Sequence, residues 1–222
     1  MSTFTTLGLS TPIVQAITEK GFTSPTPIQE KVIPVVLSNT TDVVALAQTG
    51  TGKTAAFGLP LLTLIDATSL KTQALILCPT RELCMQITRD LQQFATHMPK
   101  TSIVAVYGGA NIRTQIDAIR RGVQIIVATP GRMIDLIDRK KVDLSTIQYV
   151  VLDEADEMLN MGFKEDLDTF LSQTPKEKHT WLFSATMPNE VLRIARTYMN
   201  KPVEISAGTK NQGNENIEHI FY

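Results

Sequence analysis

The sequence predicts an α/β domain in which a parallel β-sheet is covered by helices on both faces. Short apolar runs alternate with helical patterns along the chain, and a polar or small cluster follows each run at its carboxyl end. The chain has 222 residues, 43% of them hydrophobic, which suits one large domain with a buried core.

Two helices are expected before the first strand. Ser10 is a suitable N-cap, Pro12 fits the first turn of the helix that follows, and Gly21 marks its end. The residues Pro25-Thr26-Pro27 force an extended turn, after which a second helix is expected from about 28 to 37.

The rest of the domain is expected to alternate strands with helices. Buried parallel strands are predicted at 43–46, 74–78, 102–106, 124–128, 149–152 and 180–183, with a further short strand at 203–206. Apolar residues recur at helical spacing at Leu83, Ile87 and Leu91, and again at Ile112, Ile116 and Ile119. Pro60 falls inside an expected helix, where we predict a kink rather than a break.

The last residues predict a domain boundary. The segment 207–216 is rich in Gly, Asn, Gln and Lys and predicts a linker, and 217–222 begins an apolar segment. We therefore expect one domain over 1–206, and a linker with the start of a second domain over 207–222. The natural chain is expected to continue beyond Tyr222.

The composition argues against several classes of protein, among them zinc-binding and membrane-spanning proteins. With 21 Lys and Arg against 22 Asp and Glu, a broad basic face is not expected, so any nucleic-acid contact must come from a few placed groups. Cys78 and Cys84 lack metal or redox spacing, which favours a reduced cytoplasmic protein without zinc. The sequence has neither an apolar run of membrane length nor a signal peptide at 1–10.

The segment Ala47–Thr54 predicts a phosphate-binding loop between a strand and a helix. Gly50 and Gly52 let backbone N–H groups turn towards one anion, and the helix N-terminus adds partial positive charge. Lys53 can reach the β- and γ-phosphates, and the Thr54 hydroxyl can bind Mg²⁺. The alternative is an ordinary turn with a solvated lysine, which the strand–helix junction disfavours.

Two acids follow the expected strand 149–152. Asp153 is predicted to bind the metal, partly through water, and Glu154 to orient or deprotonate an attacking water. The alternative is that both acids only cap the following helix. Because carboxyl ends of parallel strands share one edge of a sheet, these acids and the phosphate loop are expected at the same edge.

Together these motifs resemble the first RecA-like domain of the DEAD-box ATP-dependent RNA helicases. Asp153-Glu154-Ala155-Asp156 gives that family its name, and the resemblance covers roughly residues 4 to 206. The other matching segments, in family order, are Gly21-Phe22 with Pro25–Gln29, Ala47–Thr54, Pro79–Leu83, Gly108-Gly109, Thr129–Arg132 and Ser184–Thr186.

The resemblance implies that ATP and Mg²⁺ are the ligands. Gln29 would hydrogen-bond the adenine edge and Phe22 would stack on the ring, although Phe22 alone favours a core aromatic. The implied ATP-binding residues are Phe22, Thr26, Gln29, Gln48, Thr49, Gly50, Thr51, Gly52, Lys53 and Thr54, with Lys53, Asp153 and Glu154 catalytic and with Thr54 and Asp153 on the metal.

The resemblance also implies that one RNA strand is held by its sugar–phosphate backbone, independently of base sequence. The implied RNA-binding residues are Pro79, Thr80, Arg81, Gly108, Gly109, Thr129, Pro130, Gly131 and Arg132. Arg81 and Arg132 could instead form salt bridges inside the domain. Asp156, Ser184 and Thr186 are implied to couple ATP hydrolysis to strand separation, although a Ser/Thr pair before Pro188 is also an ordinary helix start.

A second RecA-like domain of the same protein is implied as the partner that completes the site, with no membrane and no indication of an oligomer. The chain alone is therefore expected to bind nucleotide weakly and to hydrolyse it poorly. The alternative functions for a chain with this phosphate loop are a small P-loop kinase, a DNA helicase or translocase, and an ATP-regulated RNA clamp without turnover. The segment that contains Phe22 and Gln29, implied to bind adenine, and the acidic tetrad Asp153-Glu154-Ala155-Asp156 favour the RNA helicase.

Overall fold

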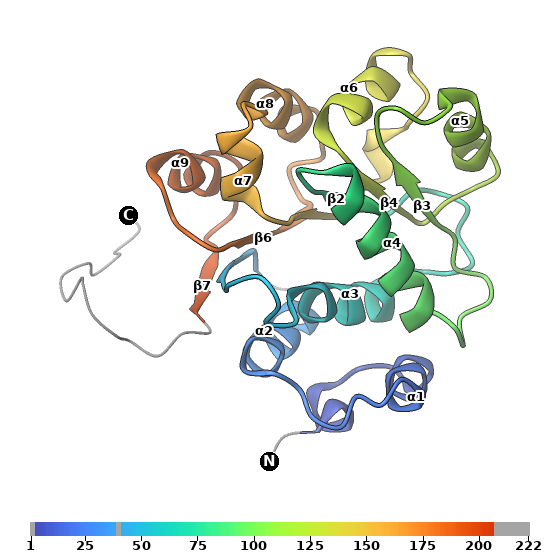
Figure 1. Cartoon of the computed structure of the whole chain (residues 1–222), viewed down its shortest axis with the longest axis vertical. Helices are drawn as coiled ribbons and strands as arrows, with labels where there is room; N and C mark the ends of the chain where they lie inside the picture. The colour runs from blue at the N-terminus through green and yellow to red at the C-terminus, as the bar shows by residue number, and fades with distance from the viewer. Residues whose placement is uncertain (1–2, 39–40, 207–222) are drawn as a thin grey trace.

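The computed structural model of the chain describes residues 3–38 and 41–206. Seven parallel strands of this part form one sheet in the order β3-β4-β2-β5-β6-β1-β7 (Figure 1). The strands are β1 (Val43–Leu46), β2 (Ala74–Leu77), β3 (Ile103–Val106), β4 (Ile125–Ala128), β5 (Tyr149–Leu152), β6 (His179–Ser184) and β7 (Val203–Ser206). The predicted α/β class is confirmed, whereas the linker expected at 207–222 lies outside the described residues.

The helices connect successive strands. In chain order they are η1 (Phe4–Leu7), α1 (Thr11–Glu19), α2 (Pro27–Leu37), α3 (Lys53–Leu64), α4 (Arg81–Phe94), α5 (Ile112–Arg120), α6 (Pro130–Asp138), η2 (Leu144–Thr146), α7 (Ala155–Asn160), α8 (Lys164–Gln173) and α9 (Asn189–Tyr198). None of them combines the length and the apolarity that a membrane span requires.

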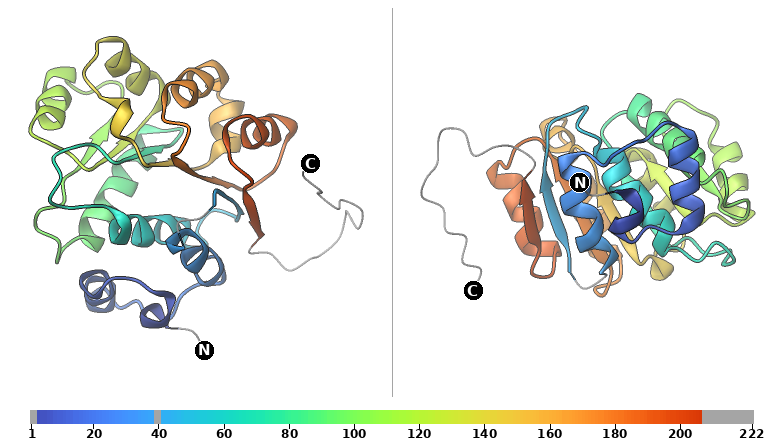
Figure 2. Two further views of the ribbon diagram at one scale, coloured as in Figure 1. Left: turned by 180° about the vertical axis from the view of Figure 1, so that it is seen from behind. Right: turned by 90° about the horizontal axis from the view of Figure 1, so that it is seen from below.

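Each face of the sheet carries its own hydrophobic core. Helices α2, α3 and α4 cover one face and α5 to α9 cover the other, as both further views show (Figure 2). Alternate strand residues serve the two cores: Tyr149 and Val151 of β5 face the first, and Val150 and Leu152 the second. Because both faces are buried, the strands are continuously apolar, which is why their positions could be predicted.

Most helices and strands begin and end where the sequence predicted. Ser10 is the N-cap of α1, and the strands match their predicted ranges to within one residue at each end. Helix α3 continues through Pro60 without a break. Helix α1 packs on α3 and α4 rather than on the sheet, so it forms an outer layer on the side of those helices that faces away from the sheet (Figure 1).

Backbone hydrogen bonds fix the carboxyl edge of the sheet. The Ala47 amide donates to the Ser184 carbonyl at 3.0 Å, and the Asp153 amide donates to the Leu77 carbonyl at 2.9 Å. Strand β6 lies between β1 and β5 in the sheet. The loop after β1, the acids after β5 and the Ser184 segment are therefore neighbours on one edge, as predicted.

Candidate functional site

The loop after β1 forms a cradle that opens at the N-terminus of α3. Gly50 and Gly52 have φ values of +78° and +93°, a region that L side chains rarely adopt. A Cβ atom on Gly52 would come within 2.4 Å of the Gln29 Nε2 atom, so space as well as backbone conformation requires glycine there. Thr51 Oγ1 donates to the Gln48 carbonyl at 2.7 Å and stabilises the turn.

Lys53 is the first residue of α3 and is only 6% exposed. Its Nζ atom is buried and has no hydrogen-bond partner among the described residues. A buried ammonium group without a partner is costly, so the position favours an anion in the adjoining cavity. The solvated lysine considered as an alternative is not what the structure shows.

Asp153 and Glu154 lie opposite this cradle. Asp153 is 2% exposed, and burial raises its pKa to about 6, although the nearby Lys53 charge acts in the opposite direction. Glu154 is the N-cap of α7 and has a φ of +54°, a strained conformation for a residue with a side chain. Acids with a perturbed pKa and residues with a strained backbone both cluster at functional sites.

The segment before α2 reaches the same cradle. Gln29 is 2% exposed; its Oε1 accepts from the Thr26 amide at 2.9 Å and its Nε2 donates to the Gly52 carbonyl at 3.1 Å. An amide has two donor hydrogens and two acceptor positions, so one of each remains for a ligand. Phe22 packs between Phe4 and Phe94 at centroid distances of 6.0 and 5.9 Å, so it is both a core aromatic and a wall of the cavity.

These residues enclose a cavity of about 490 Å³. Of the predicted ATP-site and catalytic residues, those that line it are Phe22, Gln29, Thr49, Gly50, Gly52, Lys53, Thr54, Asp153 and Glu154. Thr26, Gln48 and Thr51 support the loop behind it instead. The sequence reasoning missed the lining residues Lys20, Ala55, Leu83, Gln86, Asp90 and Phe94. Four of these residues, Leu83, Gln86, Asp90 and Phe94, belong to α4. The polar residues Gln86 and Asp90, which lie beside the apolar stripe of that helix, were the signal in the sequence that could have indicated a binding surface.

The segments predicted to hold RNA lie at the ends of β2, β3 and β4. Thr80 caps α4, because its hydroxyl accepts from the Leu83 amide at 3.2 Å. Pro79 and Pro130 are buried, so they shape the turns, whereas Gly108, Gly109 and Gly131 are exposed. Thr129 is the N-cap of α6 but makes no side-chain cap bond within the described chain.

The two arginines of these segments have different contacts. The Arg81 guanidinium lies 5.0 Å from the Tyr107 ring centroid and forms no ion pair among the described residues. Arg132 donates to the Ala110 carbonyl at 3.2 Å and to Gln115 Oε1 at 3.0 Å, and its Nε lies 3.9 Å from Asp135. The alternative that these arginines form contacts inside the domain therefore applies to Arg132 rather than to Arg81. The Arg132 bonds hold the loop after β3.

The segment after β6 is bonded to the acidic tetrad. The Thr186 amide and hydroxyl donate to Asp156 Oδ2 at 3.0 and 2.7 Å. Burial raises the Asp156 pKa, but the hydrogen-bonding groups of Thr186, Ser184 and Ala185 together outweigh it and lower that pKa overall. The Ser184 hydroxyl is buried and makes no hydrogen bond among the described residues. Thr186 thus makes the direct hydrogen bonds to Asp156, while the Ser184 hydroxyl lies close enough to help lower the Asp156 pKa.

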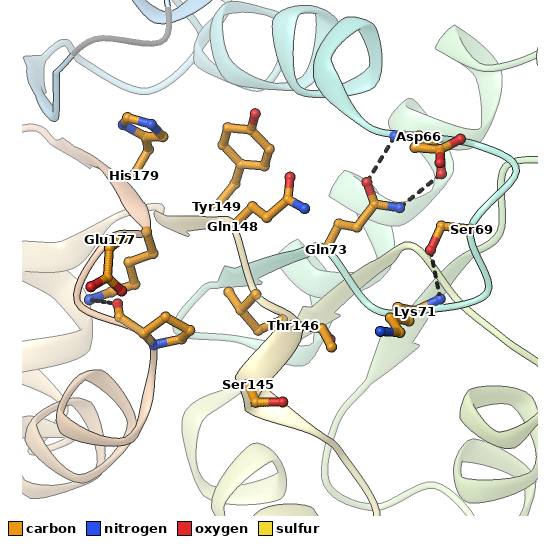
Figure 3. A pocket seen from close by; sticks show the side chains of 13 residues that line it. Asp66, Ser69, Lys71, Gln73, Ser145, Thr146, Gln148, Tyr149, Glu177 and His179 are labelled. Carbon is orange, nitrogen blue, oxygen red and sulfur yellow. Dashed lines mark hydrogen bonds between the residues drawn. The ribbon is translucent and has the colours of Figure 1, made fainter.

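A second cavity, of about 540 Å³, lies at the opposite edge of the sheet, where β2, β5 and β6 begin (Figure 3). Its polar groups are largely bonded to the protein itself. The Gln73 amide accepts from the Asp66 amide and donates to the Asp66 carbonyl, both at 2.8 Å. Lysines and acids are both present in its wall, so no net charge selects a ligand.

Comparison with known proteins gives a consistent result. Residues 26–194 match the family model described as DEAD/DEAH box helicase. The chain is 44% identical to ATP-dependent RNA helicase DeaD of Mycobacterium tuberculosis, covering 99% of this chain and 39% of that protein. It is 49% identical to RNA helicase CrhR of Synechocystis, covering 100% of this chain and 44% of that protein.

A solved structure shares the fold. The crystal structure of a DEAD box protein from the hyperthermophile Methanococcus jannaschii superposes with a TM-score of 0.88 at 43% identity, covering 93% of this chain and 56% of that one. The chain thus spans less than half the length of the two relatives compared above. The similarity therefore covers only part of those longer proteins.

Proposed function

Because the chain belongs to the DEAD/DEAH box helicase family, we propose that it is the N-terminal, ATP-binding domain of an ATP-dependent RNA helicase. The observation that carries the proposal is the buried Lys53 ammonium, which has no partner among the described residues and lies in a glycine cradle opposite Asp153 and Glu154. That arrangement suits the phosphates of a nucleotide.

ATP is proposed as the substrate. The segment Gln48–Thr54 would hold its phosphates, and Phe22, Thr26 and Gln29 would form the adenine side. The remaining donor and acceptor of the Gln29 amide support adenine, because adenine offers one of each on adjacent atoms. Phe22 lines the cavity with a ring face, which supports stacking.

Mg²⁺ is proposed as the cofactor, held by Asp153 and the Thr54 hydroxyl. The described residues contain no cluster of three or more metal-ligating acids, histidines or cysteines. This fits Mg²⁺, which binds one or two protein oxygens and completes its shell with waters and phosphates. The ion would neutralise charge that develops on the phosphates. Glu154 lines the same cavity and is proposed to orient or deprotonate the attacking water.

RNA is proposed to cross the exposed ends of β2, β3 and β4. Exposed Gly108 and Gly109, the N-terminus of α4 and the Arg81 guanidinium, which forms no ion pair within the described part of the chain, are groups that suit phosphates rather than bases. The remaining proposed members of this surface are Pro79, Thr80, Thr129, Pro130, Gly131 and Arg132. The Thr186–Asp156 contact supports a coupling role for the segment Ser184–Thr186.

The remaining parts of the proposal concern the whole protein. A second RecA-like domain would complete the ATP site, so this chain alone is expected to bind nucleotide weakly and to turn it over poorly. The buried free thiols Cys78 and Cys84 support a reduced, cytoplasmic environment.

Calorimetric titration of the chain with ATP and with GTP, each with Mg²⁺, tests the proposal. ATP is expected to bind more tightly, and Gln29→Ala is expected to remove the preference while leaving pyrophosphate affinity unchanged. Equal affinity for both nucleotides would contradict the adenine assignment. The absence of any nucleotide binding would contradict the ATP-binding function.

A further inference from the structure

One wall of the nucleotide cavity is made by a single face of α4. Leu83, Gln86, Asp90 and Phe94 line it at spacings of three or four residues, which places them on one side of the helix. Phe94 also contacts the Phe22 ring edge-to-face, so Asp90 lies one helical turn from a residue that touches the proposed base-binding aromatic. No part of the proposed ATP mechanism uses Asp90.

Asp90 is a half-buried carboxylate without a partner. It forms neither a hydrogen bond nor an ion pair with any described residue, and burial raises its pKa although Lys20 and Arg89 oppose this. The Lys20 ammonium donates to Gln93 Oε1 instead.

Several other acids that are at least partly buried are bonded, and the partly buried Asp166, which forms no hydrogen bond within the described part of the chain, does not line the cavity. Asp42 accepts from two backbone amides, Asp156 accepts from Thr186, and Asp168 accepts from Arg193 and Tyr198. A half-buried carboxylate that faces a cavity with its acceptor positions open is suited to a ligand that donates hydrogen bonds.

The position of Asp90 indicates which part of the ligand it meets. The cradle of Gly50 to Lys53 marks the phosphate end of the cavity, and Phe22 and Gln29 mark the base end. The ribose must connect the two, and its neighbouring hydroxyls are donors that a carboxylate accepts well, as in dinucleotide-binding folds. We propose that Asp90 binds the ribose 2′-hydroxyl and makes the site prefer ribonucleotides to deoxyribonucleotides. This inference rests on the proposed ATP-binding function.

The alternatives within the cavity are less suitable. Asp153 and Glu154 lie at the phosphate end, where carboxylates would meet Mg²⁺ rather than hydroxyls. The Gln29 side chain already bonds Thr26 and Gly52, and its remaining groups are matched by adenine. Asp90 is therefore the lining acid that is left for the sugar.

The test is calorimetric titration of the chain with unlabelled ATP and 2′-deoxy-ATP, both with Mg²⁺, because ribose-linked fluorophores would block the proposed contact. The wild-type chain is expected to bind ATP on the order of tenfold more tightly. Asp90→Ala should weaken ATP binding to the level of 2′-deoxy-ATP and leave 2′-deoxy-ATP unchanged. Glu82→Ala, which removes an exposed acid of the same helix outside the cavity, should keep the tenfold ratio.

Three results would overturn the inference. Equal binding of both nucleotides by the wild-type chain would show that the 2′-hydroxyl is not recognised. An Asp90→Ala chain that keeps the ATP preference would show that another group recognises it, and one that loses affinity for both nucleotides equally would show a structural role. In each case ATP binding itself remains, so the proposed function would stand.

Discussion

The two edges of the sheet contain cavities of similar size whose polar groups are used differently. At the amino edge, where the cavity measures about 540 Å³, Gln73 bonds the Asp66 backbone twice (Figure 3). Asp42, which precedes β1 at this edge, accepts from the Thr180 and Asn200 amides. At the carboxyl edge, where it measures about 490 Å³, Lys53 and Asp90 have no partner among the described residues.

The difference shows that open polar groups locate a site better than volume does. Groups that bond each other stabilise the fold, whereas groups that lack partners carry a cost that a ligand removes. The amino edge is therefore expected to contribute to stability and the carboxyl edge to binding. Each prediction below tests this division.

The largest expected effect is on nucleotide affinity. Lys53→Met should weaken ATP binding on the order of a thousandfold, because charge-assisted bonds to two phosphates are lost. Its effect on the stability of the free protein should be much smaller, since the Lys53 ammonium has no hydrogen-bond partner among the described residues and only its charge acts on Asp153. Calorimetry and urea denaturation measure the two effects.

The matched control lies at the amino edge. Lys178 is also buried, at 8% exposure, and it lines the other cavity. Lys178→Met should leave ATP affinity unchanged. If both substitutions weakened binding equally, the division between the two edges would be wrong.

A slightly smaller effect concerns the stability of the free protein at Asp153. Burial raises its pKa from 3.8 to about 6, so its stabilising contribution is full below pH 3.8 and is lost as the pH rises towards 6. At 1.36 kcal/mol per pKa unit the loss reaches about 3 kcal/mol.

Asp153→Asn should therefore stabilise the nucleotide-free protein by up to about 3 kcal/mol at pH 8. The gain should shrink progressively below pH 6. Urea denaturation in EDTA at pH 5 and pH 8 provides the measurement. A gain that is the same at both pH values would show that titration of Asp153 is not its cause.

The sequence predicted the fold to the extent that local pattern determines it. The apolar runs located the strands because both faces of the sheet are buried, and Ser10 located the start of α1. The order of the strands was not predicted, because alternation along the chain does not specify which strands become neighbours. The helix predicted over 28–37 does continue through Pro34, because packing against α3 outweighs the lost backbone bond.

For the candidate site too, local pattern predicted the residues that follow strands but not those that packing between elements brings to the cavity. Lys53, Asp153 and Glu154 follow strands directly, so the parallel sheet brings them together. Asp90 and Phe94 reach the cavity through the packing of α4 against the Phe22 segment, which no spacing in the sequence encodes. The intradomain bonds of Arg132 likewise depend on where Gln115 and Ala110 lie in space.

At the amino edge, Asp42→Ala should destabilise the protein by about 2 kcal/mol. The substitution leaves the buried Thr180 amide without its 2.8 Å acceptor and removes the Asn200 bond as well. ATP affinity should be unchanged, because Asp42 does not line the nucleotide cavity. Urea denaturation measures the change in stability, and calorimetry measures ATP affinity. A loss of ATP affinity in the folded variant would contradict the division between the edges.

The smallest effect is expected where the carboxyl edge contains a bonded pair. Thr186→Val removes the 2.7 Å hydroxyl bond to Asp156 and should destabilise the protein by about 1 kcal/mol, a value reduced by exposure to solvent. Ser184→Ala removes a buried hydroxyl that has no partner among the described residues, so it should cost less.

The pH dependence separates the Thr186 bond from simple packing. Because the Asp156 pKa is lowered in the folded protein, its stabilising contribution is present above the ordinary value of 3.8 and is lost as the pH falls through the folded pKa. The stability difference between wild type and Thr186→Val should therefore be full at pH 7 and fall in strongly acidic solution, as measured by urea denaturation. A difference that does not change with pH would mean that Thr186 stabilises the chain by packing, and the proposed link between the segment after β6 and the acidic tetrad would lose its physical basis.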